Sequence, residues 1–164
     1  MQNEHELSPE GYHRKGLALL EAGEGQAGFE QLSCAYLREP ENATYRSSYA
    51  LALALVRGQF LGAVELARAS VRQEFYNPEL YLNLSRIYLA FEFRAEAVRF
   101  LRRALMVDPE NDRVFHQLAA LGIRRRPPIR SLPRGHTLNR WLGRVQSRVL
   151  GLSPSRAAVR VQNA

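Results

Sequence analysis

The strongest constraint on the fold of this chain is a short turn segment, here called a corner, that occurs more than once. The segments REPEN and VDPEN end at Asn42 and Asn111, and each follows an amphipathic run. A degenerate copy, Phe75-Tyr76-Asn77, lies between them. The corners divide the chain into blocks of 34, 35 and 34 residues, namely 9–42, 43–77 and 78–111. A regular period of this length is typical of a repeat architecture, in which each unit packs only against its neighbours.

Each block contains two helical patterns. In the third block, apolar residues recur at helical spacing in both halves, and small residues stand where two helices must approach closely. The corners supply the boundaries, because Asn or Ser can cap the following helix and Pro fits its first position. The residues of this pattern are Tyr81, Leu84, Ser85, Tyr88, Ala97, Leu101, Ala104 and Pro109.

This pattern resembles the tetratricopeptide repeat, a helical hairpin of 34 residues. The third block matches the family's pattern at all eight of those residues. The first block departs at Lys15, while the second carries one extra residue near Gly58 and Phe75 in place of Pro. A half-repeat begins at Asp112, so the resemblance covers about residues 8–123. It implies an all-α fold, a right-handed superhelical solenoid of hairpins with a basic C-terminal extension.

The expected organisation follows from the repeats and from the charge pattern. Residues 1–112 hold 12 of the 23 Lys+Arg and all 16 Asp+Glu, whereas residues 113–164 hold 11 arginines and no acid. Such asymmetry indicates a polyanionic partner for the basic part. We expect a disordered N-terminus (1–7), three repeats plus a capping helix (8–126), a Pro-rich linker (127–137), a basic amphipathic helix (138–152) and a disordered tail (153–164).

The basic extension has three interpretations. Its apolar stripe can cap the repeat stack, which needs a covered end. It can instead lie on an anionic membrane, with Trp at the headgroup level, or contact nucleic acid through its arginines. No nucleic-acid motif is present, so the last interpretation ranks lowest. The residues concerned are Arg124, Arg125, Arg126, Arg140, Trp141, Arg144 and Arg148.

The resemblance also implies a binding groove. In this family the first helix of each pair lines the concave side, and fixed positions on it face the groove. Carried over to this chain, those positions predict an apolar floor with basic or polar groups beside it, suited to a peptide or helix. The predicted groove residues are His13, Leu17, Leu51, Leu82, Arg86, Leu89 and His116.

One known version of that groove is excluded. Some family members clamp the C-terminal carboxylate of heat-shock chaperones with Lys, Asn and Arg at five fixed places. In this chain none of the five places carries the required residue. They hold His13, Leu17, Ser48, Glu79 and Asn83.

The chemical inventory favours a non-enzymatic protein without a cofactor. Cys34 is the only cysteine, so an internal disulfide and a cysteine-based metal site are excluded. The four histidines show no metal-ligand spacing, and GEGQAG at 23–28 lacks the Lys-Ser/Thr of a phosphate loop. The N-terminus is polar and acidic, and no apolar run approaches the ~20 residues of a membrane span. We therefore expect a cytoplasmic protein, membrane-peripheral only through its extension.

The sequence thus predicts an interaction module or adaptor that binds a partner peptide in its groove. Two alternatives remain. One is a secretion-type chaperone for an apolar client, and the other is a peripheral adaptor tethered to membrane or RNA by its arginine-rich helix. A homodimer is compatible with three repeats. The use of arginine in place of lysine is typical of a GC-rich bacterial genome.

Overall fold

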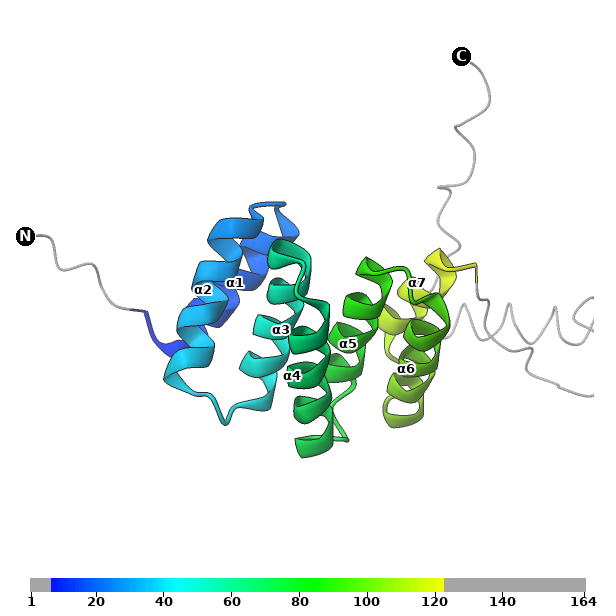
Figure 1. Cartoon of the computed structure of the whole chain (residues 1–164). Helices are drawn as coiled ribbons and strands as arrows, with labels where there is room; N and C mark the ends of the chain where they lie inside the picture. Colours follow the sequence, from blue (N-terminus) through cyan, green and yellow to red (C-terminus); the bar gives the residue numbers. More distant parts are fainter. Residues whose placement is uncertain (1–6, 123–164) are drawn as a thin grey trace, which may run out of the picture. The chain divides into compact units, whose positions relative to one another are not determined.

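The computed structural model describes residues 7–122, which form seven helices joined by short turns (Figure 1). Six of them form three hairpins that stand side by side in chain order, and the seventh follows at the end of the row. The helices are α1 (Pro9–Glu21), α2 (Gly25–Arg38), α3 (Ala43–Arg57), α4 (Phe60–Gln73), α5 (Pro78–Ala90), α6 (Arg94–Val107) and α7 (Asp112–Ala120). Among the described residues, no helix combines the length and apolar character that a bilayer crossing needs.

The first helix of every pair begins at a capped residue. The Ser8 hydroxyl accepts a hydrogen bond from the Gly11 amide at 3.1 Å. Asn42, Asn77 and Asn111 do the same for α3, α5 and α7, each accepting from an amide in the first turn at 3.1 Å. Each cap satisfies a backbone N–H that the helix itself leaves unpaired. The corners that punctuate the sequence are therefore helix starts, as predicted.

The extra residue of the second block lies in a longer helix α3. Helix α3 has 15 residues where α1 and α5 have 13, and the turn after it has two residues where theirs have three. Gly58 ends α3 in the left-handed conformation, with φ of 66°. Because glycine adopts that conformation without a steric penalty, the longer helix still closes into a tight hairpin.

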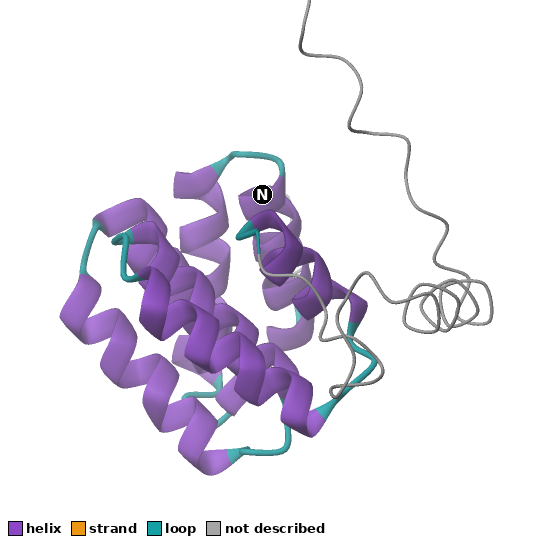
Figure 2. Ribbon diagram, turned by 90° about the vertical axis from the view of Figure 1, so that its right-hand side faces the viewer, coloured by secondary structure: helices purple, strands orange, loops and turns teal. Residues whose placement is uncertain are grey.

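The core lies between the two helices of each pair and between neighbouring pairs. Seven of the eight repeat-pattern residues in the third block, all except Pro109, are buried. Lys15, the departure in the first block, is exposed, so its charge remains in water. Figure 2 shows short loops joining the helices at both of their ends. The middle pair packs against the first pair through α2 and α3 and against the third pair through α4 and α5. Helix α3 contacts α1, α2, α4 and α5.

The two helices of the first pair approach each other closely. Gly16 on α1 and Gly28 on α2 are both buried where the two helices cross. A Cβ atom added to Gly28 would lie 2.9 Å from Leu20 Cγ and 3.0 Å from the Gly16 carbonyl oxygen. The second and third pairs carry alanine, Ala63 and Ala97, at the place of Gly28.

The predicted linker, the predicted basic helix and the end of the predicted capping segment lie outside the described residues. So do all the residues singled out there, namely Arg124, Arg125, Arg126, Arg140, Trp141, Arg144 and Arg148.

Candidate functional site: the surface of the first helices

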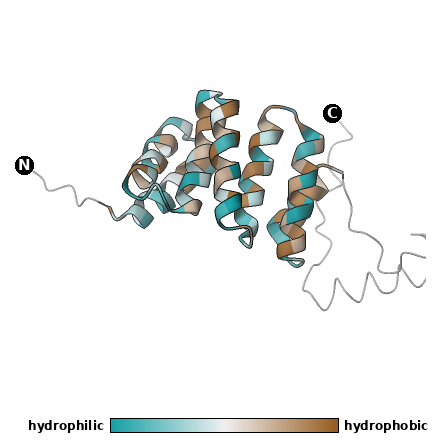
Figure 3. Ribbon diagram, turned by 60° about the horizontal axis from the view of Figure 1, so that its bottom comes forward, coloured by the Kyte–Doolittle hydropathy of each residue, from teal (hydrophilic) through white to brown (hydrophobic). Residues whose placement is uncertain are grey.

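The candidate site is the surface formed by the first helix of each pair, α1, α3 and α5, together with α7. We call it the first-helix face. Helices α1 and α3 contact each other, as do α3 and α5. Figure 3, which colours the ribbon by residue hydropathy, shows hydrophobic and hydrophilic residues mixed along the helices.

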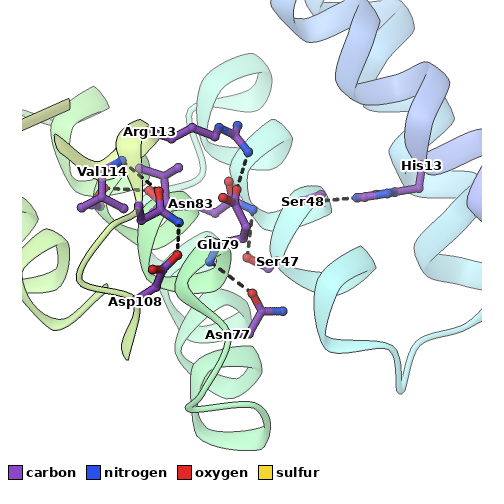
Figure 4. Close-up of polar contacts among 12 residues, drawn as sticks. His13, Ser47, Ser48, Asn77, Glu79, Asn83, Asp108, Arg113 and Val114 are labelled. Carbon is purple, nitrogen blue, oxygen red and sulfur yellow. Dashed lines mark hydrogen bonds and ion pairs between the residues drawn. The ribbon is translucent and has the colours of Figure 1, made fainter. Parts of the chain in front are cut away.

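Polar contacts cross-link the first helices (Figure 4). His13 on α1 and Ser48 on α3 are 2.9 Å apart, between Nε2 and Oγ. The neighbouring Ser47 accepts a hydrogen bond from Asn83 Nδ2 on α5 at 3.2 Å. Arg113 on α7 donates to the Glu79 carboxylate on α5 at 2.6 Å. Each first helix is thus joined to the next by one polar contact. We call these three contacts the cross-helix bonds.

His13 is a titratable group on this face that contacts two residues of α3. Its ring is half-buried and lies on the Tyr45 ring, with 4.9 Å between the centroids. Burial lowers the pKa of His13 below its ordinary value, because desolvation disfavours the charged imidazolium. The nearby Glu10 carboxylate opposes this effect and raises the pKa. The neutral ring can pair with the Ser48 hydroxyl in either tautomer.

Two of the predicted groove residues are buried. Leu51 is 1% exposed and Leu82 is 3% exposed, so neither can form the floor of an accessible groove. The physical reason is that α3 is covered by its neighbours on both sides, and α5 packs against α3 in turn. These two leucines stabilise the contact between first helices, which corrects the interpretation drawn from the family positions.

The other predicted residues reach the surface. Leu17 on α1 and the pair Arg86 and Leu89 on α5 are half-buried, and His116 on α7 is exposed. Among the described residues, no hydrogen bond or ion pair holds the guanidinium of Arg86. The structure places Leu89 close to one helical turn after Arg86, whereas Leu17 lies two first helices away.

Sequence reasoning missed Leu55. This side chain on α3 is 52% exposed, close to one turn after the buried Leu51. Every residue from Tyr49 to Val56 is apolar, so spacing alone could not separate the buried side of α3 from its open side. The available signal was the extra residue near Gly58, which lengthens the second block beyond the family pattern.

The places that clamp a carboxylate in some tetratricopeptide proteins have another use here. Four of the five residues at those places take part in the cross-helix bonds, namely His13, Ser48, Glu79 and Asn83. Their polar groups therefore contact each other across helices. Among residues 7–122, no group of His, Cys, Asp and Glu is arranged to hold a metal ion.

Comparisons with known proteins identify the fold. No protein-family profile and no curated protein sequence matches this chain. The Arabidopsis OM64 TPR domain is 22% identical, with a TM-score of 0.54 over 69% of this chain and 93% of that domain. The first TPR of Spaghetti (RPAP3), bound to the HSP90 peptide SRMEEVD, is 17% identical with a TM-score of 0.54, over 70% and 90%. MamA from Desulfovibrio magneticus RS-1 is 18% identical with a TM-score of 0.53, over 92% and 78%.

These likenesses, taken with the hairpin order, define an all-helical repeat solenoid. Its repeats are tetratricopeptide-like, as the sequence pattern predicted.

Proposed function

We propose that this protein is a non-enzymatic interaction module that holds a segment of a partner protein on its first-helix face. The observation that carries the proposal is an unpaired arginine among apolar side chains. Arg86 has no acidic partner among the described residues, Leu89 follows it on the same helix, and Leu55 is exposed on the neighbouring helix. Such a mixture of one charge and apolar anchors is what peptide-binding surfaces present.

The cross-helix bonds support this proposal by setting the spacing of the first helices before a partner arrives. His13–Ser48 holds α1 to α3, and Ser47–Asn83 holds α3 to α5. A surface whose elements are already held in place loses less conformational entropy on binding. The main conformational-entropy cost of binding is then the ordering of the partner segment.

The chemistry of the face suggests the kind of segment. A carboxylate can form a charge-assisted pair with the Arg86 guanidinium, and aliphatic or aromatic side chains can cover Leu55 and Leu89. This differs from the clamp type of recognition, because four of the five clamp places here hold residues engaged in cross-helix bonds.

The test compares two full-length double variants in affinity purification from native lysate with quantitative mass spectrometry. Arg86→Glu with Leu89→Asp reverses the charge and removes the apolar anchor on α5. Arg102→Glu with Met106→Asp makes the matched change on the exposed side of α6. We expect the α5 variant to lose a partner that wild type and the α6 variant retain. An unchanged partner set in the folded α5 variant would overturn the proposal.

A third variant separates the predicted role of the basic extension. Replacing Arg140, Arg144 and Arg148 with Glu leaves residues 7–122 unaltered. If only this variant loses its partner, or loses membrane or RNA, the tethered-adaptor alternative holds instead. If the α5 variant alone loses an apolar client, the same face works as the chaperone alternative requires.

A further inference from the structure

Three arginines of the second helices α4 and α6 lie around a buried pair of stacked aromatic rings, one from α5 and one from α6. Tyr88 and Phe100 stack with 5.5 Å between their centroids. The guanidinium carbons of Arg99 and Arg103 each lie 5.6 Å from the centre of the Phe100 ring. Arg68 lies 5.9 Å from the Tyr88 ring and donates a hydrogen bond to its hydroxyl. We call Arg68, Arg99 and Arg103 the arginine cluster.

Among the described residues, none of the three guanidiniums of the cluster forms an ion pair, although Glu65 and Glu96 lie close to one helical turn before Arg68 and Arg99. Residues 7–122 carry 13 Lys+Arg and 14 Asp+Glu, so the fold as a whole is close to neutral. Helices α4 and α6 alone carry six arginines and two glutamates. The positive charge is therefore concentrated here and is not a general property of the surface.

The aromatic rings determine how these arginines can act. A guanidinium that lies over a ring face keeps its N–H edges available for hydrogen bonds. All three side chains are exposed, so those edges can reach solvent or an anion. Because no carboxylate of the described residues forms an ion pair with them, these guanidiniums can form charge-assisted hydrogen bonds with an anionic ligand.

An apolar patch adjoins the cluster. Phe91 and Phe93 each pack on Phe60, and the Phe60 and Phe93 ring centroids lie 5.8 Å and 6.2 Å from that of Tyr88. Phe93 is 45% exposed. The charged and apolar parts are linked through the buried Tyr88 ring, which both Arg68 and Phe93 contact.

We propose that this surface binds an acidic segment of a partner protein, with carboxylates on the arginine cluster and an aromatic or aliphatic side chain against Phe93. The charge and the apolar patch together match such a segment. A nucleic acid backbone is a worse match, since it needs basic groups spread along a track, whereas these converge on one ring pair. An anionic membrane is attracted by the charge of a whole face, and the fold is close to neutral.

The experiment measures binding of a fluorescent synthetic peptide, glutamates and aspartates around one central phenylalanine, to the full-length chain by anisotropy. Arg99→Gln with Arg103→Gln removes two charges that contact Phe100. Arg72→Gln with Arg102→Gln removes two exposed charges from the same helices without a ring contact. The arginines beyond residue 122 give the same background in every variant.

We expect the first double variant to weaken peptide binding about tenfold or more, since charge-assisted contacts are lost. The control should change it less than about twofold, and Phe93→Ala should weaken only peptides that contain the central phenylalanine. Arg99→Lys with Arg103→Lys keeps the charge and serves as a second variant if glutamine disturbs folding. It should still bind the peptide more tightly than the glutamine pair.

If the cluster variant and the control variant lose peptide affinity equally, the proposal is wrong, because the peptide would then respond only to the overall positive charge. Single-stranded RNA and vesicles containing phosphatidylserine are the competing probes. If either depends on the arginine cluster while the peptide does not bind, the partner belongs to that class and the proposal is wrong. Because these variants leave α5 and the first-helix face unaltered, failure here leaves the proposed function standing.

Discussion

Replacing Gly28 with alanine tests the close approach of α1 and α2 against a matched change at Gly62. Both glycines lie in the first turn of a second helix, Gly28 in α2 and Gly62 in α4. A Cβ at Gly28 would meet Leu20 Cγ at 2.9 Å and the Gly16 carbonyl oxygen at 3.0 Å. A Cβ at Gly62 would meet only Leu53 Cδ2, at an ordinary 3.9 Å.

The two changes share one free-energy term and differ in the other. Alanine favours a helix over glycine by about 1 kcal/mol or less, and this gain applies to both variants. Overpacking costs about 1–3 kcal/mol and applies only to Gly28→Ala, because the backbone oxygen that it meets cannot rotate away. Gly62→Ala should therefore be stabilised by roughly 0.5–1 kcal/mol. Gly28→Ala should be about 1–3 kcal/mol less stable than Gly62→Ala.

The assay is urea unfolding followed by circular dichroism at 222 nm, with wild type and both variants compared at one temperature. The difference between the two alanine variants is the informative quantity, since the helix-propensity gain nearly cancels in it. If Gly28→Ala is as stable as Gly62→Ala, the first pair has room for a methyl group. The proposed reason for glycine at this crossing would then be refuted.

Two further predictions concern His13 and Glu92. Because burial lowers the pKa of His13 in the folded state, the unfolded chain binds a proton at this histidine first as the pH falls. The contribution of neutral His13 to the unfolding free energy is therefore full above about pH 6.5 and is lost as the pH falls through the folded-state pKa. The unfolding free energy of wild type and His13→Gln, measured from pH 8 to 5, should converge toward acid, and parallel curves would contradict this. Glu92 has φ of 65° in a turn where the first hairpin has Gly23 with φ of 85°. Glu92→Gly should stabilise the fold by about 1 kcal/mol in urea unfolding, and a loss of stability would show that Glu92 has a compensating contact.

The fold could be predicted because its signals are local. An Asn or Ser at each corner and a Pro at the first position of α1 and α5 define helix starts through contacts within one turn. Small residues at the crossings are also readable, since they recur with the repeat. The helix boundaries and the solenoid therefore followed from residues close together in the chain.

The candidate site was less predictable because accessibility depends on neighbouring repeats. A family position indicates which side of a first helix a residue occupies, but not how deeply the next helix covers it. Leu51 and Leu82 are covered in this way, whereas Leu55 is not. The arginine cluster had no sequence signal either, since Arg68 lies 31 residues or more before the other two and meets them only through Tyr88 and Phe100.

The cross-helix bonds have a consequence for how the chain assembles during synthesis. They join residues 35, 36 and 34 positions apart, so each spans about one repeat. The loop-closure entropy is then nearly the same for each bond, because it depends only weakly on chain length. Each new first helix that leaves the ribosome can dock on the previous one without waiting for distant sequence. Contacts of such short range favour rapid folding in order from the N-terminus, with little time for unpaired helices to associate with other chains.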